Sequence, residues 1–550
     1  MKKIAITFLL VAVTASAGAQ TMYDALTFSE NDYVGTARTM AMGNAFTALG
    51  GDLGSLSINP AGSAVANYSQ ITITPGMAIS VNKANGTLAP GEGFPSSFGS
   101  TIRNESIGFL LPNLGFTVNF NTHRTSGVKN LTLGFVMNAS NTYRDGLYAR
   151  GLNSRSSFAG GMASMALGFD PANLSGEEAW YSYPSDWQYI LAYQSYMISP
   201  ISDGSTEYAG VTENVYTDQN GNVNGIELPG AVDQTFGRSL KGYRYDYLLN
   251  FGMNISDVVY IGANLGFAQL KYSSEEYFIE TPEEKSLFQT SFQQLNYRSV
   301  YNASGTGVYG KFGVIVTPFK GLRIGAAIQT PTANVIKETW YSSASVKADQ
   351  NNSGSAETPE GKYEYRLSSP MRFNVGAAYT FGSFAVISAD YEMCNYGRMR
   401  LNEKAIADNS GFDAVNDEIK DFMGISNMFR AGVEIRPFKM FAVRAGYGLT
   451  TAPDWYYDNF GDKVKNTAKT HKYSFGLGFS SNGSFFMDLA FTAKKYAEEY
   501  ITPYVTAMLD SNGNIMTDIN NLPIADYNAS PEIVNRKWLW TAAITFGFRF

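Results

Sequence analysis

The sequence has almost none of the residues that build covalent frameworks and most catalytic or metal sites. Cys394 is the only cysteine in 550 residues, so a disulfide framework is excluded. There are two histidines, and no His-x-x-x-His, paired cysteines or phosphate-binding glycine loop. Asp510 to Asn514 only faintly resembles a calcium loop, because the full spacing and the closing Glu are missing. We therefore expect no enzyme activity, no cofactor and no metal.

The sequence also lacks charge and long apolar runs. Charged residues make up 16%, and the net charge of −7 gives no indication of nucleic-acid binding. The one helix-length apolar segment follows Lys2 and Lys3 and ends in Ala17-Gly18-Ala19, which predicts a signal peptide over residues 1–19. If the mature chain lies in a membrane, it has to cross as a closed barrel.

What is abundant is glycine (54 residues), aromatic residues (14%) and alternation of apolar with small or polar residues. In 439–450, Phe441, Val443, Ala445 and Tyr447 alternate with residues such as Arg444. Apolar-out, polar-in alternation is typical of strands in an outer-membrane barrel. About fourteen such segments follow residue 68, near 69–83, 105–121, 128–143, 242–256, 258–273, 299–317, 321–337, 361–381, 383–400, 424–437, 439–450, 467–480, 483–497 and 533–550.

The connections between these segments alternate between short and long. Outer-membrane barrels have short periplasmic turns and long extracellular loops, whereas a soluble sandwich has no reason to sort its loops in this way. The longest predicted loop is 144–241. The last segment alternates from Trp538 to the C-terminal Phe550, which resembles the signal read by the barrel-assembly machinery. We predict an all-β, antiparallel barrel of about fourteen strands over 68–550 in a Gram-negative-type outer membrane.

The stretch before the strands differs from both the signal and the barrel. Thr36 to Leu49 is rich in Ala, Met and Gly, and it is followed by Asn59-Pro60-Ala61-Gly62. This stretch resembles the N-terminal hatch of the FadL-type outer-membrane transporters. The resemblance implies a helical hatch over 20–67 that plugs a fourteen-stranded barrel, and uptake of long-chain fatty acids or other hydrophobic compounds. The insertion at 144–241 departs from the family and leaves the ligand open.

That insertion contains a dense aromatic and apolar cluster. Hydrophobic ligands bind in apolar concavities with a few polar groups, and Tyr and Trp suit a surface that is both wet and apolar. The cluster therefore predicts ligand capture, although a loop that packs on itself, caps the barrel or touches lipopolysaccharide gives the same pattern. The residues are Trp180, Tyr183, Trp187, Tyr189, Leu191, Tyr193 and Met197.

The second strand changes phase at Pro112-Asn113. Ile107 and Phe109 are odd-numbered, whereas Leu114 and Phe116 are even-numbered, so a bulge has to absorb one residue. Proline cannot donate to the ladder. The resemblance implies that a kink beside the hatch forms a lateral opening into the membrane. A bulge that only adjusts barrel curvature is the alternative.

Charged residues occupy predicted inward positions of the later strands. Ion pairs between wall and plug, and solvated lumen groups, are the simplest interpretation; binding of a ligand carboxylate is the other. The residues are Arg372, Asp390, Glu392, Arg430, Glu434, Arg436, Arg444 and Asp488.

The function expected from the resemblance is passive uptake of hydrophobic small molecules, with release past the hatch. The expected partners are the ligand, outer-membrane lipid, lipopolysaccharide and the assembly machinery. The main alternative is a surface scaffold or secretion-associated barrel that holds protein partners. A haem receptor and an outer-membrane lipase, with His471 as its base, are less favoured alternatives.

Overall fold

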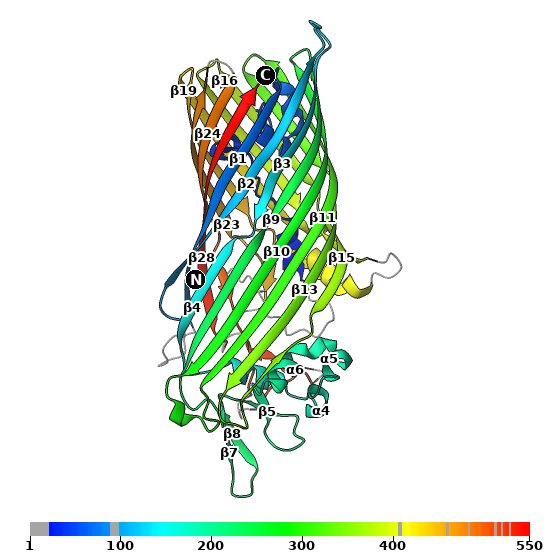
Figure 1. Cartoon of the computed structure of the whole chain (residues 1–550). Helices are drawn as coiled ribbons and strands as arrows, with labels where there is room; N and C mark the ends of the chain where they lie inside the picture. Colours follow the sequence, from blue (N-terminus) through cyan, green and yellow to red (C-terminus); the bar gives the residue numbers. More distant parts are fainter. Residues whose placement is uncertain are drawn as a thin grey trace.

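The computed structural model describes residues 21–87, 98–404, 410–457, 461–481, 484–510, 514–518, 521–526 and 530–550. The predicted signal peptide lies outside these ranges. The described chain forms a closed antiparallel barrel of 14 strands, in which β1 pairs with both β2 and β28 (Figure 1). Among the described residues, no helix has both the length and the apolar character to cross a bilayer.

Several of the fourteen strands are divided into two elements. In chain order they are β1 (Gln70–Thr87), β2 (Ile102–Asn121), β3 (Val128–Thr142) with β4 (Asp145–Asn153), β9 (Val232–Ile255), β10 (Val259–Pro282), β11 (Gln294–Phe319), β12 (Leu322–Gln329) with β13 (Thr332–Lys347), β15 (Gly361–Ser369) with β16 (Arg372–Phe381), β17 (Ala385–Asn395) with β18 (Arg400–Glu403), β19 (Ile425–Phe438), β20 (Phe441–Thr451), β23 (Lys469–Ser480), β24 (Phe485–Lys495) with β25 (Glu499–Ile501), and β28 (Glu532–Arg549).

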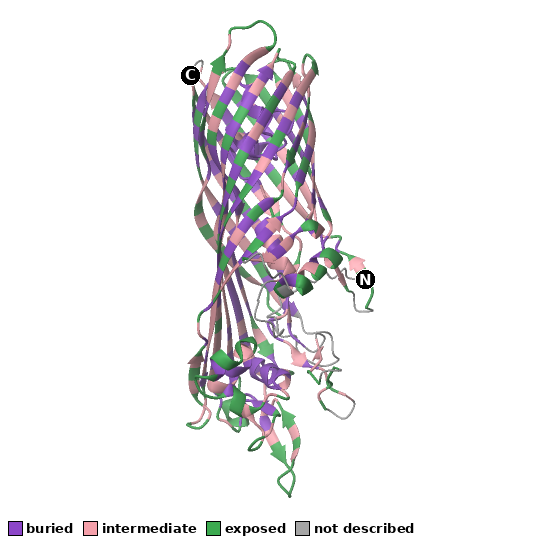
Figure 2. Ribbon diagram, turned by 90° about the vertical axis from the view of Figure 1, so that its right-hand side faces the viewer, coloured by how far each residue is buried: buried purple, intermediate pink, exposed green. Residues whose placement is uncertain are grey.

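The outer surface of the barrel carries an apolar belt with an exposed residue on every strand. The alternation predicted from the sequence is visible as a chequered pattern of buried and exposed residues along the wall (Figure 2). An apolar outer face on a closed barrel is what a lipid environment selects, and the protein is an outer-membrane β-barrel. The belt comprises Ile71, Phe116, Leu133, Leu249, Leu265, Phe312, Ile324, Phe373, Ile387, Phe429, Val443, Phe475, Phe491 and Phe546.

The N-terminal stretch folds inside the barrel: residues 36–66 form a compact hatch in the end that has the short turns, whereas the first helix lies farther along the barrel, beside α7 (Asp413–Phe422) (Figure 1). It contains α1 (Met22–Ser29), α2 (Ala37–Ala41), and the 3-10 helices η1 (Leu53–Ser57) and η2 (Pro60–Val65). Side chains of Thr21, Thr36, Asp52 and Asn59 cap these four helices by accepting backbone N–H bonds. Local capping therefore lets such short helices form without a long hydrogen-bonded run.

The hatch touches the wall where the wall has glycine. Gly262 and Gly313 are neighbours across β10 and β11, and Gly432 and Gly446 across β19 and β20. A Cβ on any of these four would overlap hatch atoms of Pro60, Ala61, Asn59, Met42 or Gly43. Glycine permits this direct approach of two backbones, so the hatch fits the wall with almost no clearance.

Beyond the lipid-facing belt, one side of the barrel continues as a tall half-shell. β9, β10 and β11 have 24, 24 and 26 residues, whereas a strand needs about 9–11 residues to cross the bilayer. The predicted loop boundaries at 144–241 are therefore wrong at both ends, because β4 and the start of β9 continue the wall. Alternation weakens there because the inner face is covered by protein rather than by water.

Residues 154–231 form an outer cap inside this half-shell (Figure 1). The cap contains α3 (Phe158–Met165), α4 (Pro171–Leu174), α5 (Ala179–Ser182), η3 (Pro184–Asp186), α6 (Trp187–Gln194), β5 (Ile198–Pro200), β6 (Tyr208–Gly210), β7 (Asn214–Thr217) and β8 (Val223–Glu227). Its core is shared with the wall, through contacts such as Phe158 with Phe278.

The remaining described elements belong to the connections. They are η4 (Lys285–Leu287), β14 (Gly354–Glu357), η5 (Tyr396–Arg398), η6 (Ser410–Phe412), α7 (Asp413–Phe422), β21 (Trp455–Tyr457), β22 (Lys463–Lys465), β26 (Thr506–Ala507) and β27 (Ala525–Asp526).

The close fit of hatch and wall predicts a position-specific effect of adding a side chain. Gly313→Val forces Asn59 and Pro60 away from β11, and we expect it to destabilise the barrel by about 1–3 kcal/mol. Gly310→Val is the matched control, because a Cβ there has no neighbour closer than 3.7 Å. Thermal unfolding and limited proteolysis of the hatch in detergent test this. Equal behaviour of the two variants would contradict a tight contact between hatch and wall.

Candidate functional site

Asn59 of the Asn-Pro-Ala-Gly motif ties the hatch to the wall. Its side-chain amide donates to the carbonyl oxygens of Thr47 (2.6 Å), Val314 (3.2 Å) and Ala326 (3.4 Å), which lie in the hatch, β11 and β12. Its side-chain oxygen accepts from the backbone N–H of Ala61 (3.0 Å). Pro60, Ala61 and Gly62 are buried beside it. The motif thus positions the floor of the lumen.

The first group of lumen charges is centred on Glu434, which is fully buried. Arg38 of the hatch and Arg444 of β20 donate to it at 2.9 and 2.6 Å, and Arg444 also pairs with Asp488. Arg436 reaches the same carboxylate at 2.8 Å. The predicted ion pairing of wall and plug is present here.

The second group joins β16, β17 and β19 to the hatch. Arg372 pairs with Glu392 (3.0 Å) and donates to the Ser29 carbonyl of the hatch (2.6 Å). Arg430 lies 3.4 Å from Glu392 and 3.7 Å from Asp390. Asp390 in turn accepts from the backbone and hydroxyl of Thr47 in the hatch, at 2.8 and 2.7 Å.

On the outer side of the hatch lies a cavity of about 360 Å³. Its volume falls in the range of small-molecule sites, but many of its lining groups are charged. The hatch contributes Glu30 and Asp32, and the wall contributes Arg238, Arg372 and others. The cavity therefore suits a molecule that has a polar group as well as an apolar part. Further lining residues include Tyr23, Leu26, Asp145, Leu240, Glu392, Tyr396, Met428, Lys494, Tyr496 and Lys537.

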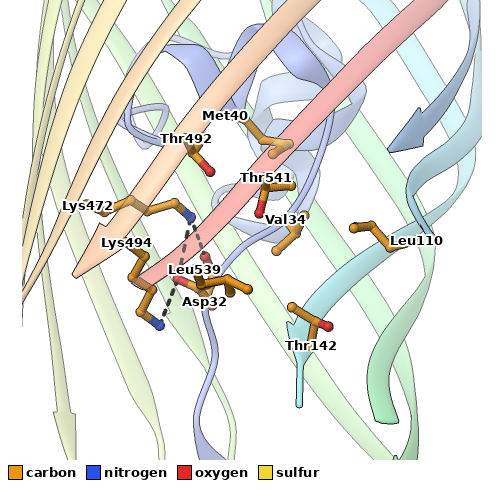
Figure 3. Close-up of a pocket in the computed structure, with 10 residues that line it drawn as sticks. All are labelled: Asp32, Val34, Met40, Leu110, Thr142, Lys472, Thr492, Lys494, Leu539 and Thr541. Atoms are coloured by element: carbon orange, nitrogen blue, oxygen red, sulfur yellow. Dashed lines mark hydrogen bonds and ion pairs between the residues drawn. The ribbon is translucent and has the colours of Figure 1, made fainter. Parts of the chain in front are cut away.

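Two lysines converge on one hatch carboxylate (Figure 3): Asp32 and Lys494 line this cavity, and Lys472 lines a smaller cavity that shares these two residues. Lys472 of β23 and Lys494 of β24 each lie 3.4 Å from an oxygen of Asp32. Burial alone would raise the pKa of the Asp32 carboxyl, but the two lysines hold it below its usual value. Glu30 is a second hatch carboxyl that interacts with Lys494, so the two ammonium groups face two carboxyl groups of the hatch.

Apolar side chains lie next to the two lysines. A small cavity of about 10 Å³, enough for one water molecule, is enclosed by the lysines, Val34, Met40, Leu110 and Leu539 (Figure 3). Leu110 belongs to the second strand, two residues before Pro112. The lysine pair therefore lies beside the predicted lateral opening.

The predicted bulge in β2 is confirmed. Thr74 pairs with Asn113, but Gly76 pairs with Leu110, so Leu111 and Pro112 are opposite Pro75 alone. Ile107 and Phe109 on one side of the bulge, and Leu114 and Phe116 on the other, all face outward. Neither Pro75 nor Pro112 has an N–H to donate.

The ladder between β2 and β3 stops at the same place. Its last pair is Asn113 with Asn138, and the remainder of β2 pairs with β1 alone. After a further bulge between Ala139 and Asn141, the chain continues as β4, which pairs with β9. The wall is thus interrupted next to Phe109, which is 92% exposed within the apolar belt.

The two edges of this interruption overlap. A Cβ on Gly146 of β4 would lie 3.4 Å from the Cβ of Ser106 of β2. Asp145 accepts hydrogen bonds from Ser80 (3.1 Å) and Asn82 (2.7 Å), whose side chains are buried on the inner face of β1. Arg144 donates to the Ile107 carbonyl at 2.9 Å. β4 therefore lies on the lumen side of β2, held by side chains instead of a strand ladder.

Most of the aromatic cluster predicted for ligand capture is inside the outer cap. Trp180, Tyr189, Leu191 and Met197 are buried in its core, and Trp187 and Tyr193 pack against that core. Tyr183 is exposed. A role of this set in capture stays a prediction, which in this arrangement depends on Tyr183 or on movement of the cap.

Sequence reasoning missed Asp32, Lys472 and Lys494. The signal was available for the lysines, because Lys472 and Lys494 continue the inward positions of Ser474 and Thr492. No signal in the sequence indicated that the two lysines converge on Asp32, because the path of the hatch through the barrel determines this contact. His471, the candidate base of a lipase, contacts the Tyr447 hydroxyl (2.8 Å) and the Tyr473 ring.

No protein-family model matches the chain, and no curated protein aligns with it. Among solved structures, it is similar to the Pseudomonas putida toluene transporter TodX, with 11% identity, 94% of this chain, 99% of that chain and a TM-score of 0.49. A Pseudomonas aeruginosa FadL homologue is 9% identical, with 94% of this chain and 98% of that chain covered and a TM-score of 0.49. The Ralstonia pickettii toluene transporter TbuX is 12% identical, with 94% of this chain and 99% of that chain covered and a TM-score of 0.47. FadL is the family that the hatch sequence resembles.

The buried charge group predicts a large effect of removing one partner. Glu434→Gln leaves Arg38 and Arg444 without their shared carboxylate, and we expect a loss of about 3–5 kcal/mol. Glu275→Gln is the control, because the Arg298–Glu275 pair is exposed and worth less than about 1 kcal/mol. Guanidinium unfolding in detergent, followed by tryptophan fluorescence, measures both. A small loss for Glu434→Gln would mean that the hatch is not anchored by this group.

Proposed function

We propose that the protein is a passive outer-membrane channel for hydrophobic small molecules, such as long-chain fatty acids. The observation that carries the proposal is the interrupted ladder between β2 and β3, which lies within the apolar belt and beside the cavity above the hatch. Such an interruption offers a path from the lumen into the membrane. A structural barrel without transport has no need of it.

The proposed route begins at the outer mouth. The ligand meets the outer cap, where Tyr183 and the surrounding aromatic side chains capture it, and enters the 360 Å³ cavity. A carboxylate or similar anionic group binds Lys472 and Lys494, while the apolar part faces Leu110, Val34 and Leu539. This assigns ligand binding to the lysine pair and leaves the buried arginines to hold the hatch.

Release occurs sideways, past a small part of the hatch. The glycine contacts and the Glu434 group fix the hatch from Arg38 to Gly62, so movement of the whole plug is unfavourable. The segment before it, Glu30 to Val34, lines the cavity and is the part whose displacement opens a path to Pro112. Uptake then runs down a concentration gradient.

A surface scaffold is the second candidate. The outer cap has its own apolar core and stands beyond the membrane on the half-shell, where a protein partner has access to it. Lipopolysaccharide and the assembly machinery, contacting Phe550, remain expected partners in either case.

The proposal is tested by purifying the barrel from membranes in mild detergent, recording native mass spectra and extracting the bound molecules with organic solvent. A stoichiometric amphiphile, reduced in the Lys472→Met/Lys494→Met variant, is the expected result. An empty barrel that retains a bound protein would favour the scaffold.

The route itself is tested by closing the wall. Ser106→Cys/Gly146→Cys, made in a Cys394→Ser background, places two Cβ atoms at a separation suitable for a disulfide. Oxidation should reduce uptake of a labelled long-chain fatty acid about tenfold or more, and reductant should restore it, because a closed exit limits flux. Gln269→Cys/Thr306→Cys, directly opposite on β10 and β11, is the matched control. Unchanged uptake through the oxidised Ser106–Gly146 variant would exclude this exit.

A further inference from the structure

Three cations lie side by side on the outer face of β28, β1 and β2. In the strand register, Lys83 is directly opposite Arg536 on one side and Arg103 on the other. All three are exposed and face outward, like Val81 and Ile79 below them. We call Arg536, Lys83 and Arg103 the cation row. Like charges directly opposite in a sheet are destabilising, so the row is unfavourable unless an anion compensates it.

Nearby acids compensate only part of the charge. Arg536 pairs with Glu498 (2.8 Å) and Arg103 pairs with Glu105. Lys83 makes no ion pair with any described residue. Lys495 of β24 is exposed beside the row, with its ammonium group 5.9 Å from the centre of the Trp538 ring. Four cations and two acids leave two positive charges in excess.

The height of the row is set by the aromatic residues beneath it. Trp538 and Trp540 face outward on β28 with stacked rings 5.8 Å apart. They lie nearer the outer end of this strand than the outward-facing Phe546 and Phe548. Aromatic girdles mark the interfaces of a bilayer. Arg536 is the next outward residue beyond Trp538, so the cation row lies at the level of the outer-leaflet headgroups.

We propose that the cation row and Lys495 bind the phosphate groups of a phosphorylated glycolipid of the outer leaflet. Phosphate is the anion that membrane lipids present at this height, and Arg and Lys form charge-assisted hydrogen bonds to it. The acyl chains then lie on Trp538, Trp540 and Ile79. Since Arg103 is on the part of β2 that lacks a β3 partner, the bound lipid also holds this free edge in place.

The test uses the full-length barrel in detergent and native mass spectrometry with bis-phosphorylated lipid A. The Lys83→Gln/Lys495→Gln variant should bind about tenfold or more weakly. Lys271→Gln/Lys337→Gln is the matched control, because these lysines are also exposed on the outer face and the charge change is equal. It should bind within about twofold of the wild type.

Three outcomes would overturn the proposal. An equal loss in the control variant would indicate general charge attraction. Equal binding of the same lipid without its phosphates would indicate contact with acyl chains alone. Full competition by millimolar inorganic phosphate would indicate a site for the free anion.

A stability measurement separates a lipid site from a structural role. Without lipid, the Lys83→Gln/Lys495→Gln variant should unfold at the same or a higher temperature than the wild type, because repulsion is relieved. With bis-phosphorylated lipid A, the wild type should gain thermal stability that the variant does not gain. A variant that is less stable without lipid would instead assign the row to folding.

Discussion

A β-barrel in a membrane has to satisfy its backbone hydrogen bonds strand by strand, because lipid offers no partners. In the described part of this protein the ladder between β2 and β3 ends at Asn113 and Asn138, and beyond it the backbone N–H groups of Val34 and Asp32 in the hatch donate to the Ala139 and Ser140 carbonyls of β3. Side chains replace part of the missing ladder there: Arg144 donates to the Ile107 carbonyl, and Asp145 binds Ser80 and Asn82. Contacts of this kind hold two edges together and still allow them to separate, which a continuous ladder does not.

The hatch, in contrast to these two edges, is attached tightly to the wall. Its backbone lies against wall glycines, Asn59 donates hydrogen bonds to two wall strands, and Glu434 pairs with arginines of both the hatch and the wall. Opening the floor of the barrel would expose these buried charges and leave them unpaired, which is costly. The closed floor and the interrupted side wall are therefore complementary: the same lumen is sealed towards the periplasm and weakest towards the lipid.

Much of this could be read from the sequence, and the reasons for the failures are physical. Alternation and loop lengths predicted the strands, and the phase change at Pro112 predicted the bulge, because each depends on local pattern; the hatch was predicted from the resemblance of Asn59-Pro60-Ala61-Gly62 and the stretch before it. The half-shell was missed, since the cap covers the inner face of β9 to β11 and alternation no longer separates lipid from water. The aromatic cluster pointed to an exposed surface, but residues such as Leu191 and Met197 serve equally well as a core. Asp32 and its lysines meet only through the tertiary path of the hatch.

The polarity of the cavity narrows what the proposed route can carry. A wholly apolar molecule would have to desolvate polar groups of the cavity such as the exposed Glu30 carboxyl without replacing their hydrogen bonds, which is unfavourable. An amphiphile avoids this, because its head can bind Lys472 and Lys494 while its tail reaches Leu110 and the apolar belt. The head would then be the last part to leave. On the proposed route, exit into the membrane would accordingly be limited by the release of one anionic group from two lysines, and not by passage of the apolar chain.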